Sequence, residues 1–185
     1  AASDGPSGLE AALDRLAAAA LAAARSGSEI VLVSDSALSL DRLPVPSVLA
    51  VGAVHTALTD AGLRGRTDIV VDAADILAVH AMAMAVAVGA TAVHPRLALQ
   101  AAVEMAGGRG AEAITPTTAI ANLVTAFEAG LRKTLARMGI GSVASYVGGA
   151  LIDTIDLAPE VVARCFPGAA ASATRVASSF ESAAG

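Results

Sequence analysis

Short apolar runs alternate with longer stretches of helical periodicity in the first half of the chain. The runs at 30–33 and 69–71 are continuous apolar segments, a pattern typical of strands buried on both faces, and Thr-Ala-Val at 91–93 is predicted as a third strand. Helical spacing of apolar residues fills the intervals, at 47–61 and 76–88. Strands and helices in this order predict an α/β fold of parallel βαβ units joined by crossover helices.

A glycine-rich segment at 107–113 is the best candidate for a boundary within the chain. We therefore expect a βαβ region at 1–106, a linker at 107–113 and a second region at 114–185. The remaining predicted elements are helices at 9–25, 96–105, 115–137 and 159–165 and a fourth strand at 142–146.

Composition adds that helices should dominate the fold. The 185 residues are 55% hydrophobic, largely alanine, which has the highest helix propensity. A net charge of −5 without a basic stripe argues against a nucleic-acid partner. The stretch 77–93 lacks charged residues, but a buried helix leading into a strand explains it better than a membrane span. A single cysteine, Cys165, and a polar start without a leader pattern favour a cytoplasmic protein.

Candidate chemistry is sparse and concentrates where the predicted strands end. Asp35, Asp72 and His94 each follow an apolar run, and the carboxyl ends of parallel strands meet at one edge where ligands collect. Residues at such an edge could bind a small ligand, transfer a proton as paired acids, or cap loops. Loop capping explains these strand-end residues better than the other two roles. His55, His80 and His94 match no zinc spacing, so we expect no metal site. Asp75 is expected to cap the helix at 76–88.

Several motifs resemble one family in an unbroken order. Ile30-Val31-Leu32-Val33-Ser34-Asp35-Ser36 is similar to Ile-Leu-Val-Leu-Ser-Asp-Arg, and the segment 45–58 to Ile-Pro-x-Leu-Leu-Ala-Val-Gly-Ala-Val-His-His-His-Leu. The segments 94–98, 130–133 and 137–142 continue the similarity beyond the glycine-rich segment. These motifs belong to the large subunit of glutamate synthase, and the resemblance covers nearly the whole chain.

The resemblance implies a place within a much larger flavoenzyme. That family makes two glutamates from glutamine and 2-oxoglutarate, with ammonia passing from a glutaminase domain to an FMN barrel that carries an iron–sulfur cluster. Residues 1–106 would end the central domain, and 114–185 would open an incomplete (β/α) barrel. Met138, Gly139, Ile140 and Ser142, on the first barrel strand, would then lie near the flavin. FMN is expected only with a complete barrel, and no cofactor is expected for this chain alone.

Polar positions of the family pattern have changed in this chain. The Arg and Gln of its Ser-Tyr-Arg-Gly-Ala-Gln segment are Val147 and Ala150 here, which removes polar recognition. We therefore expect no catalytic residue within the chain and a scaffold role between the ammonia-producing and flavin sites. Its partners would be the remainder of a glutamate synthase polypeptide or other subunits, in a homo- or hetero-oligomer. The alternative is a non-catalytic, glutamate-synthase-like assembly or interaction module.

Overall fold

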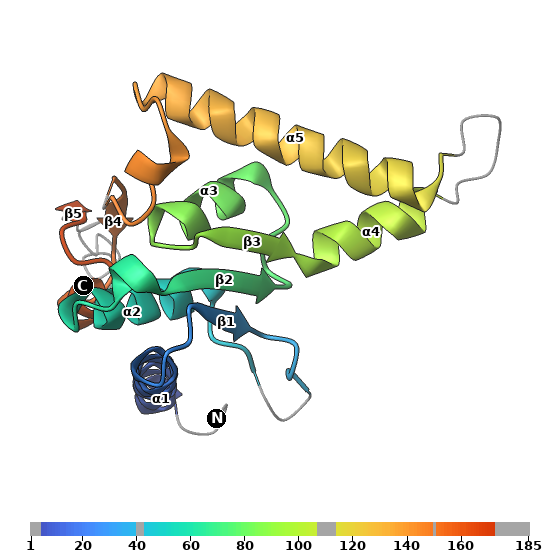
Figure 1. Cartoon of the computed structure of the whole chain (residues 1–185). Coiled ribbons are helices and arrows are strands. Elements are labelled where there is room, and N and C mark those ends of the chain that lie inside the picture. Colours follow the sequence, from blue (N-terminus) through green and yellow to red (C-terminus); the bar gives the residue numbers. More distant parts are fainter. Residues whose placement is uncertain (1–4, 40–42, 107–113, 150, 173–185) are drawn as a thin grey trace, which may run out of the picture.

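The computed structural model of the chain describes residues 5–39, 43–106, 114–149 and 151–172, and its centre is a three-stranded parallel sheet (Figure 1). The strands are β1 (Ile30–Ser34), β2 (Asp68–Ala73) and β3 (Ala92–Pro95), and β2 lies between the other two. The predicted parallel βαβ architecture is confirmed. The register places residues 32, 70 and 92 side by side across the sheet.

Helices make up most of the remaining structure and match the predicted order. They are α1 (Gly5–Arg25), α2 (Ser47–Asp60), α3 (Val79–Ala87), α4 (Arg96–Ala106), α5 (Pro116–Arg137) and α6 (Pro159–Cys165). A short 3₁₀ helix, η2 (Arg64–Arg66), connects α2 to β2. Thr115 caps the long helix α5 by accepting a hydrogen bond from the backbone N–H of Thr118, as expected for Thr-Pro at a helix start.

The main core lies between one face of the sheet and helices α1 and α2. Val33, Ile69 and Val71 point to this face and pack with Leu13 of α1 and Leu58 of α2. All five side chains are buried. Alternate residues of a strand point to opposite faces, so the second face of the sheet carries a different set of side chains.

The second face contradicts the prediction that the strands are buried on both sides. Ile30 and Leu32 of β1 are 62% and 61% exposed, although the run from 30 to 33 is apolar throughout. A continuous apolar run indicates that both faces avoid water, but the residues that the structure describes cover only one of them.

Helix α5 packs against α3 and α4 on the far side of α3 from the sheet (Figure 1). A second, smaller core joins Ala83 and Val86 of α3 to Leu135 of α5 and to Tyr146. Gly130 allows the close approach, since a Cβ built at this position would lie 2.5 Å from Cγ2 of Val79. The part of the chain after the glycine-rich segment is therefore packed onto the βαβ region.

The fourth strand predicted at 142–146 is wrong. This segment forms a 3₁₀ helix, η3 (Val143–Ser145), in which the Ser142 side chain accepts a hydrogen bond from the backbone N–H of Ser145. Serine side chains stabilise such turns by bonding to a nearby backbone group, in competition with strand pairing.

Two short strands after this point were not predicted. The strands β4 (Asp153–Ile155) and β5 (Ala170–Ser172) pair in parallel with each other. The incomplete barrel at 114–185 stays a prediction, and the predicted linker at 107–113 lies outside the described residues.

The charge-free stretch at 77–93 has the structure predicted for it, since it contains α3 and the start of β3. Over the described part of the chain, no helix combines the length and apolar character that a membrane crossing requires.

Candidate functional site

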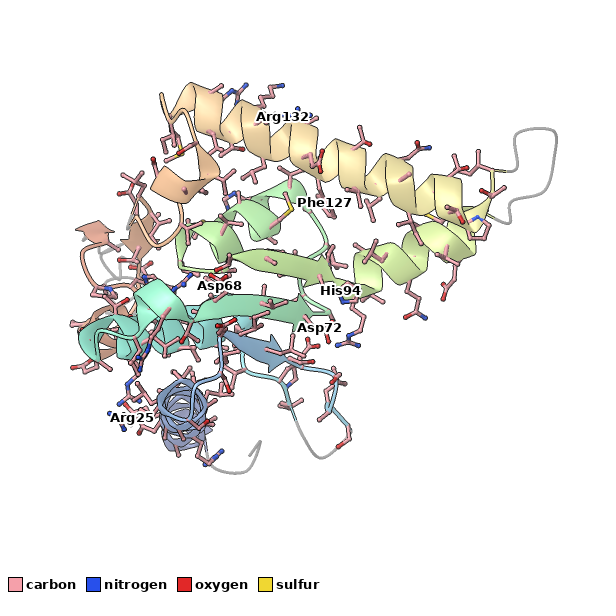
Figure 2. The ribbon with its side chains drawn as sticks, in the orientation of Figure 1. Arg25, Asp68, Asp72, His94, Phe127 and Arg132 are labelled. Atoms are coloured by element: carbon pink, nitrogen blue, oxygen red, sulfur yellow. The ribbon has the colours of Figure 1, made fainter. Side chains whose placement is uncertain are left out.

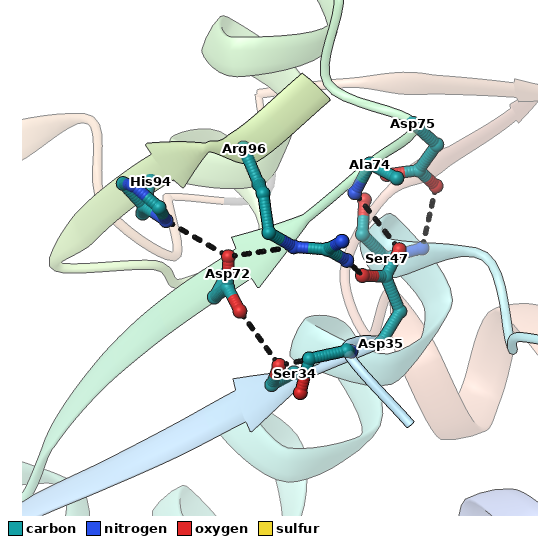
Figure 3. Close-up of polar contacts among 9 residues, drawn as sticks. Ser34, Asp35, Ser47, Asp72, Ala74, Asp75, His94 and Arg96 are labelled. Carbon is teal, nitrogen blue, oxygen red and sulfur yellow. Dashed lines mark hydrogen bonds and ion pairs between the residues drawn. The ribbon is translucent and has the colours of Figure 1, made fainter. Parts of the chain in front are cut away.

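A polar cluster occupies the carboxyl ends of the three parallel strands (Figures 2 and 3). Asp72 belongs to β2 and His94 to β3, and Arg96 is the first residue of α4. Ser34 ends β1, and Asp35 follows it. The parallel topology brings these residues together from positions 22 to 61 residues apart in the chain. The sequence therefore predicted correctly that Asp35, Asp72 and His94 lie at one edge of the sheet.

Asp72 is the centre of the cluster because it touches both neighbouring strands. Its Oδ1 accepts a hydrogen bond from Nδ1 of His94 at 2.8 Å and one from Nε of Arg96 at 3.3 Å. Its Oδ2 accepts a hydrogen bond from the Ser34 hydroxyl at 2.7 Å. Burial by itself would raise the pKa of the Asp72 carboxyl, but the bonds from His94 and Ser34 and the charge of Arg96 outweigh burial and lower it. Asp72 is thus ionised at neutral pH.

Asp35 is held by the same arginine. Nη2 of Arg96 forms an ion pair with Oδ1 of Asp35, and the backbone N–H of Ala74 donates to Oδ2 at 2.8 Å. Arg96 therefore bridges the two carboxylates, whose side chains are only 12% and 16% exposed. A planar guanidinium suits this task because it donates in several directions at once.

The hydrogen bonds decide what the cluster can do chemically. Each of the four carboxylate oxygens of Asp35 and Asp72 accepts at least one hydrogen bond from the protein. A general base works best with a pKa near the working pH, and the lowered pKa of Asp72 is unfavourable for that role. The geometry supports a clamp that fixes the strand ends and their loops.

Arg96 and Ser34 were absent from the site predicted from the sequence. Ser34 sits beside Asp35 at a strand end, where hydroxyls commonly bond to neighbouring groups. Two carboxylates at one edge also require a cation nearby, since like charges repel. Arg96 immediately follows the His94-Pro95 pair that ends β3, and this position was the available signal.

Asp75 lies next to the cluster and has a different role from the one predicted. The helix α3 begins at Val79, and its first turn has no side-chain cap. Oδ2 of Asp75 instead accepts a hydrogen bond at 2.9 Å from the backbone N–H of Ser47, the first residue of α2. The carboxylate thus satisfies an unpaired donor at the start of α2, where negative charge is favourable.

A groove of about 320 Å³ runs beside the cluster, between α1 and the carboxyl ends of β1 and β2. Its wall is mostly apolar, with Arg15, Ser34, Asp35, Ser47 and Asp72 as polar members. The hydroxyl of Ser47 is buried and has no hydrogen-bond partner within the described structure. Both carboxylates that face the groove already bond to protein groups.

The residues predicted to contact flavin lie elsewhere. Met138 is the C-cap residue after α5, and Gly139 follows with a φ of 71°, a left-handed conformation that favours glycine. Ile140 packs on the smaller core, and Ser142 caps η3. The carboxyl end of α5 is at the opposite end of the sheet from the polar cluster (Figure 1). Their role in flavin binding stays a prediction.

His55 belongs to a second polar arrangement, at the amino end of the sheet. Nε of Arg64 donates to its Nδ1 at 3.1 Å, so the ring is neutral with its proton on Nε2. Burial, and then the charge of Arg64, lower the pKa of His55. Its ring lies against the backbones of Gly89 and Gly148, where an added Cβ would come within 2.4 Å.

His55 also lines a smaller hollow of about 170 Å³ with the buried Cys165. Burial raises the pKa of the Cys165 thiol to about 11, so the side chain is unreactive at neutral pH. His80 is exposed, and the three histidines lie in separate places. No group of three or more His, Cys, Asp or Glu side chains suited to a metal ion occurs in the described structure.

Comparison with known proteins gives one consistent result. The family model described as "Glutamate synthase central domain" matches residues 2–158, a span that crosses the glycine-rich segment. The chain is 34% identical to "Glutamate synthase [NADH]" of Schizosaccharomyces pombe over 91% of its length. It is 37% identical to "Ferredoxin-dependent glutamate synthase 2" of Synechocystis and to "Glutamate synthase [NADPH] large chain" of Azospirillum brasilense, over 89% and 88% of its length. The chain spans only 8% to 11% of the length of these relatives.

Proposed function

This chain belongs to the glutamate synthase family, and we propose that it is a scaffold segment of a longer glutamate synthase polypeptide, placed between the ammonia-producing and the flavin-binding parts. The observation that carries the proposal is that every carboxylate oxygen of the polar cluster already bonds to a protein group. Arg96, His94, Ser34 and the backbone N–H of Ala74 donate hydrogen bonds to the oxygens of Asp35 and Asp72, which suits a structural clamp better than a reacting centre.

The range of relatives supports the same assignment. Their names specify NADH, NADPH or ferredoxin, yet the chain matches them at 34% to 37% identity. If the segment selected the electron donor, its sequence identity would be expected to differ between the relatives named for NADH, NADPH and ferredoxin. We infer that the segment serves a task common to all of them, and that its partners are the other domains of the polypeptide or further subunits in an oligomer. We propose the cytoplasm as its compartment, in keeping with the single cysteine.

The flavin link is part of the proposal. Under it, FMN binds to a barrel completed by residues outside this chain, and Met138, Gly139, Ile140 and Ser142 contribute to its surroundings. The chain alone would then bind no flavin and have no activity.

The experiment tests coupling between the two half-reactions in the full-length polypeptide. Arg96→Ala removes the bridge between Asp35 and Asp72, and Arg132→Ala is the control, because Arg132 is exposed on α5 (Figure 2) and makes no ion pair within the described residues. Glutamine hydrolysis, flavin content and glutamate formation are measured for both. A scaffold role predicts that Arg96→Ala keeps hydrolysis within about twofold and retains its flavin, while glutamate per glutamine falls and free ammonia accumulates.

Two results would contradict the scaffold role. Loss of glutamine hydrolysis in a folded, flavin-loaded Arg96→Ala protein would assign the cluster to catalysis. Unchanged coupling in Arg96→Ala would show that the clamp does not hold the two parts in place. Arg96→Lys keeps the positive charge without the planar fork, so an intermediate coupling ratio is expected for it.

A further inference from the structure

The second face of the central sheet is an exposed apolar surface. Leu32, Val70 and Ala92 are neighbours in register across the three strands, and Ile30 lies beside them on β1. We call these four residues the open face. Ile30 and Leu32 keep more than three fifths of their surface in contact with water. Parallel sheets are normally covered on both faces, so an uncovered face of this kind needs an occupant.

Polar groups border the open face at both ends of the strands. At the amino end, the hydroxyl of Thr91 donates a hydrogen bond to Oδ1 of Asp68 at 3.1 Å. At the carboxyl end, Asp72 joins Ser34 and His94. An apolar centre with a polar rim is the usual anatomy of a protein–protein interface.

We propose that the open face is covered, in the complete protein, by an apolar surface from another part of the same glutamate synthase polypeptide. The inference rests on the proposed function, in which this chain is a segment of a longer polypeptide. The chain spans 8% to 11% of its curated relatives, so about nine tenths of such a polypeptide lies outside the match. A surface tethered to the same chain has a high effective concentration, which favours it over a separate partner.

Thiol labelling of the full-length polypeptide tests this proposal. Leu32→Cys places a thiol on the open face, and Val33→Cys places one on the covered face of the same strand, where Val33 is only 8% exposed. Each variant is treated with a maleimide under native conditions and in denaturant, and the peptide that carries the substitution is quantified by mass spectrometry. Native Cys165 adds little background near neutral pH because its thiol is buried and its pKa is about 11.

The labelling rates of the two variants distinguish a covered open face from one that contacts water. A covered open face predicts that both variants react about 100-fold more slowly in the native protein than in denaturant, as expected when labelling requires local opening. Labelling of Leu32→Cys within about tenfold of its denatured rate, with Val33→Cys protected, would overturn the proposal.

Dilution distinguishes the proposed occupant from a second copy of the chain. Protection of Leu32→Cys that is independent of protein concentration supports cover from the same polypeptide. Protection that disappears together with an oligomer on dilution would assign the open face to a second copy and overturn the proposal. Labelling does not depend on glutamate formation, so a failure of the coupling experiment leaves this result unaffected.

Discussion

Gly130 controls how closely α5 approaches α3, and its substitution gives a sharp test of that packing. A Cβ added at Gly130 would lie 2.5 Å from Cγ2 and 2.6 Å from Cγ1 of Val79. Valine is β-branched and stiff at χ1, so it cannot rotate away freely. Overpacking of this kind costs about 1–3 kcal/mol. Alanine also raises helix propensity over glycine by about 1 kcal/mol, so the net loss for Gly130→Ala should be at most about 2 kcal/mol.

The same substitution should cost less when most of the contact is removed. In a Val79→Ala background only the Cβ of residue 79 remains, 3.1 Å from the added Cβ. Gly130→Ala should then be close to neutral, or stabilising by at most about 1 kcal/mol through helix propensity. The free energy of unfolding is measured in urea by circular dichroism for the wild type, both single variants and the double variant, which forms a double-mutant cycle. An equal effect of Gly130→Ala in both backgrounds would refute the close approach of α5 to α3.

Two further predictions concern the amino end of the sheet. Gly148 and Gly62 have almost the same φ, 65° and 67°, but a Cβ at Gly148 would meet the ring of His55 at 2.4 Å, and one at Gly62 would meet nothing within 4 Å. Gly62→Ala should lower the free energy of unfolding by about 1–2 kcal/mol, because alanine is strained in a left-handed backbone conformation. Gly148→Ala should lower it by about 1–3 kcal/mol more, because its Cβ also meets the ring. Urea unfolding measures both values, and equal losses would contradict the contact with His55. The pKa of His55, followed by proton NMR, should lie below 6.5 and rise in Arg64→Met, because the neighbouring charge is removed. Since the folded pKa is lowered, this histidine should reduce stability as the pH falls below about 6.5, and an unchanged His55 pKa in Arg64→Met would contradict the assigned cause.

Strand and helix order could be predicted from the sequence because hydrophobic periodicity reports local structure directly. The apolar runs at 30–33 and 69–71 and the Thr115-Pro116 helix start each carry their own signal. The segment 142–146 carried no such signal, because the Ser142 side chain bonds locally to the backbone N–H and the hydroxyl of Ser145, and this outweighs a weak strand pattern. The short strands β4 and β5 pair with each other across the intervening α6, and such a contact has no local signal.

The location of the candidate site could be predicted from the strand topology, but the contacts within it could not. Parallel strands place Asp35, Asp72 and His94 at one edge whatever their exact contacts. Arg96 closes the network through the direction of its side chain, which depends on how α4 leaves the sheet. Asp75 was assigned to the nearest helix in sequence, whereas its carboxylate binds the start of a helix that is 28 residues earlier in the chain. Sequence proximity is a poor guide to such partners.

The bond between Asp75 and Ser47 also bears on the order in which the fold can form. The first amide of α2 has no partner within its own helix, and its acceptor comes from the loop after β2. A nascent chain that has made α2 but not yet β2 therefore lacks this cap, and the helix start frays. The β1–α2 unit therefore gains its full stability only when β2 and the loop that carries Asp75 are in place. The segment should accordingly behave as one cooperative unit during synthesis and refolding, and not as a series of independently stable repeats.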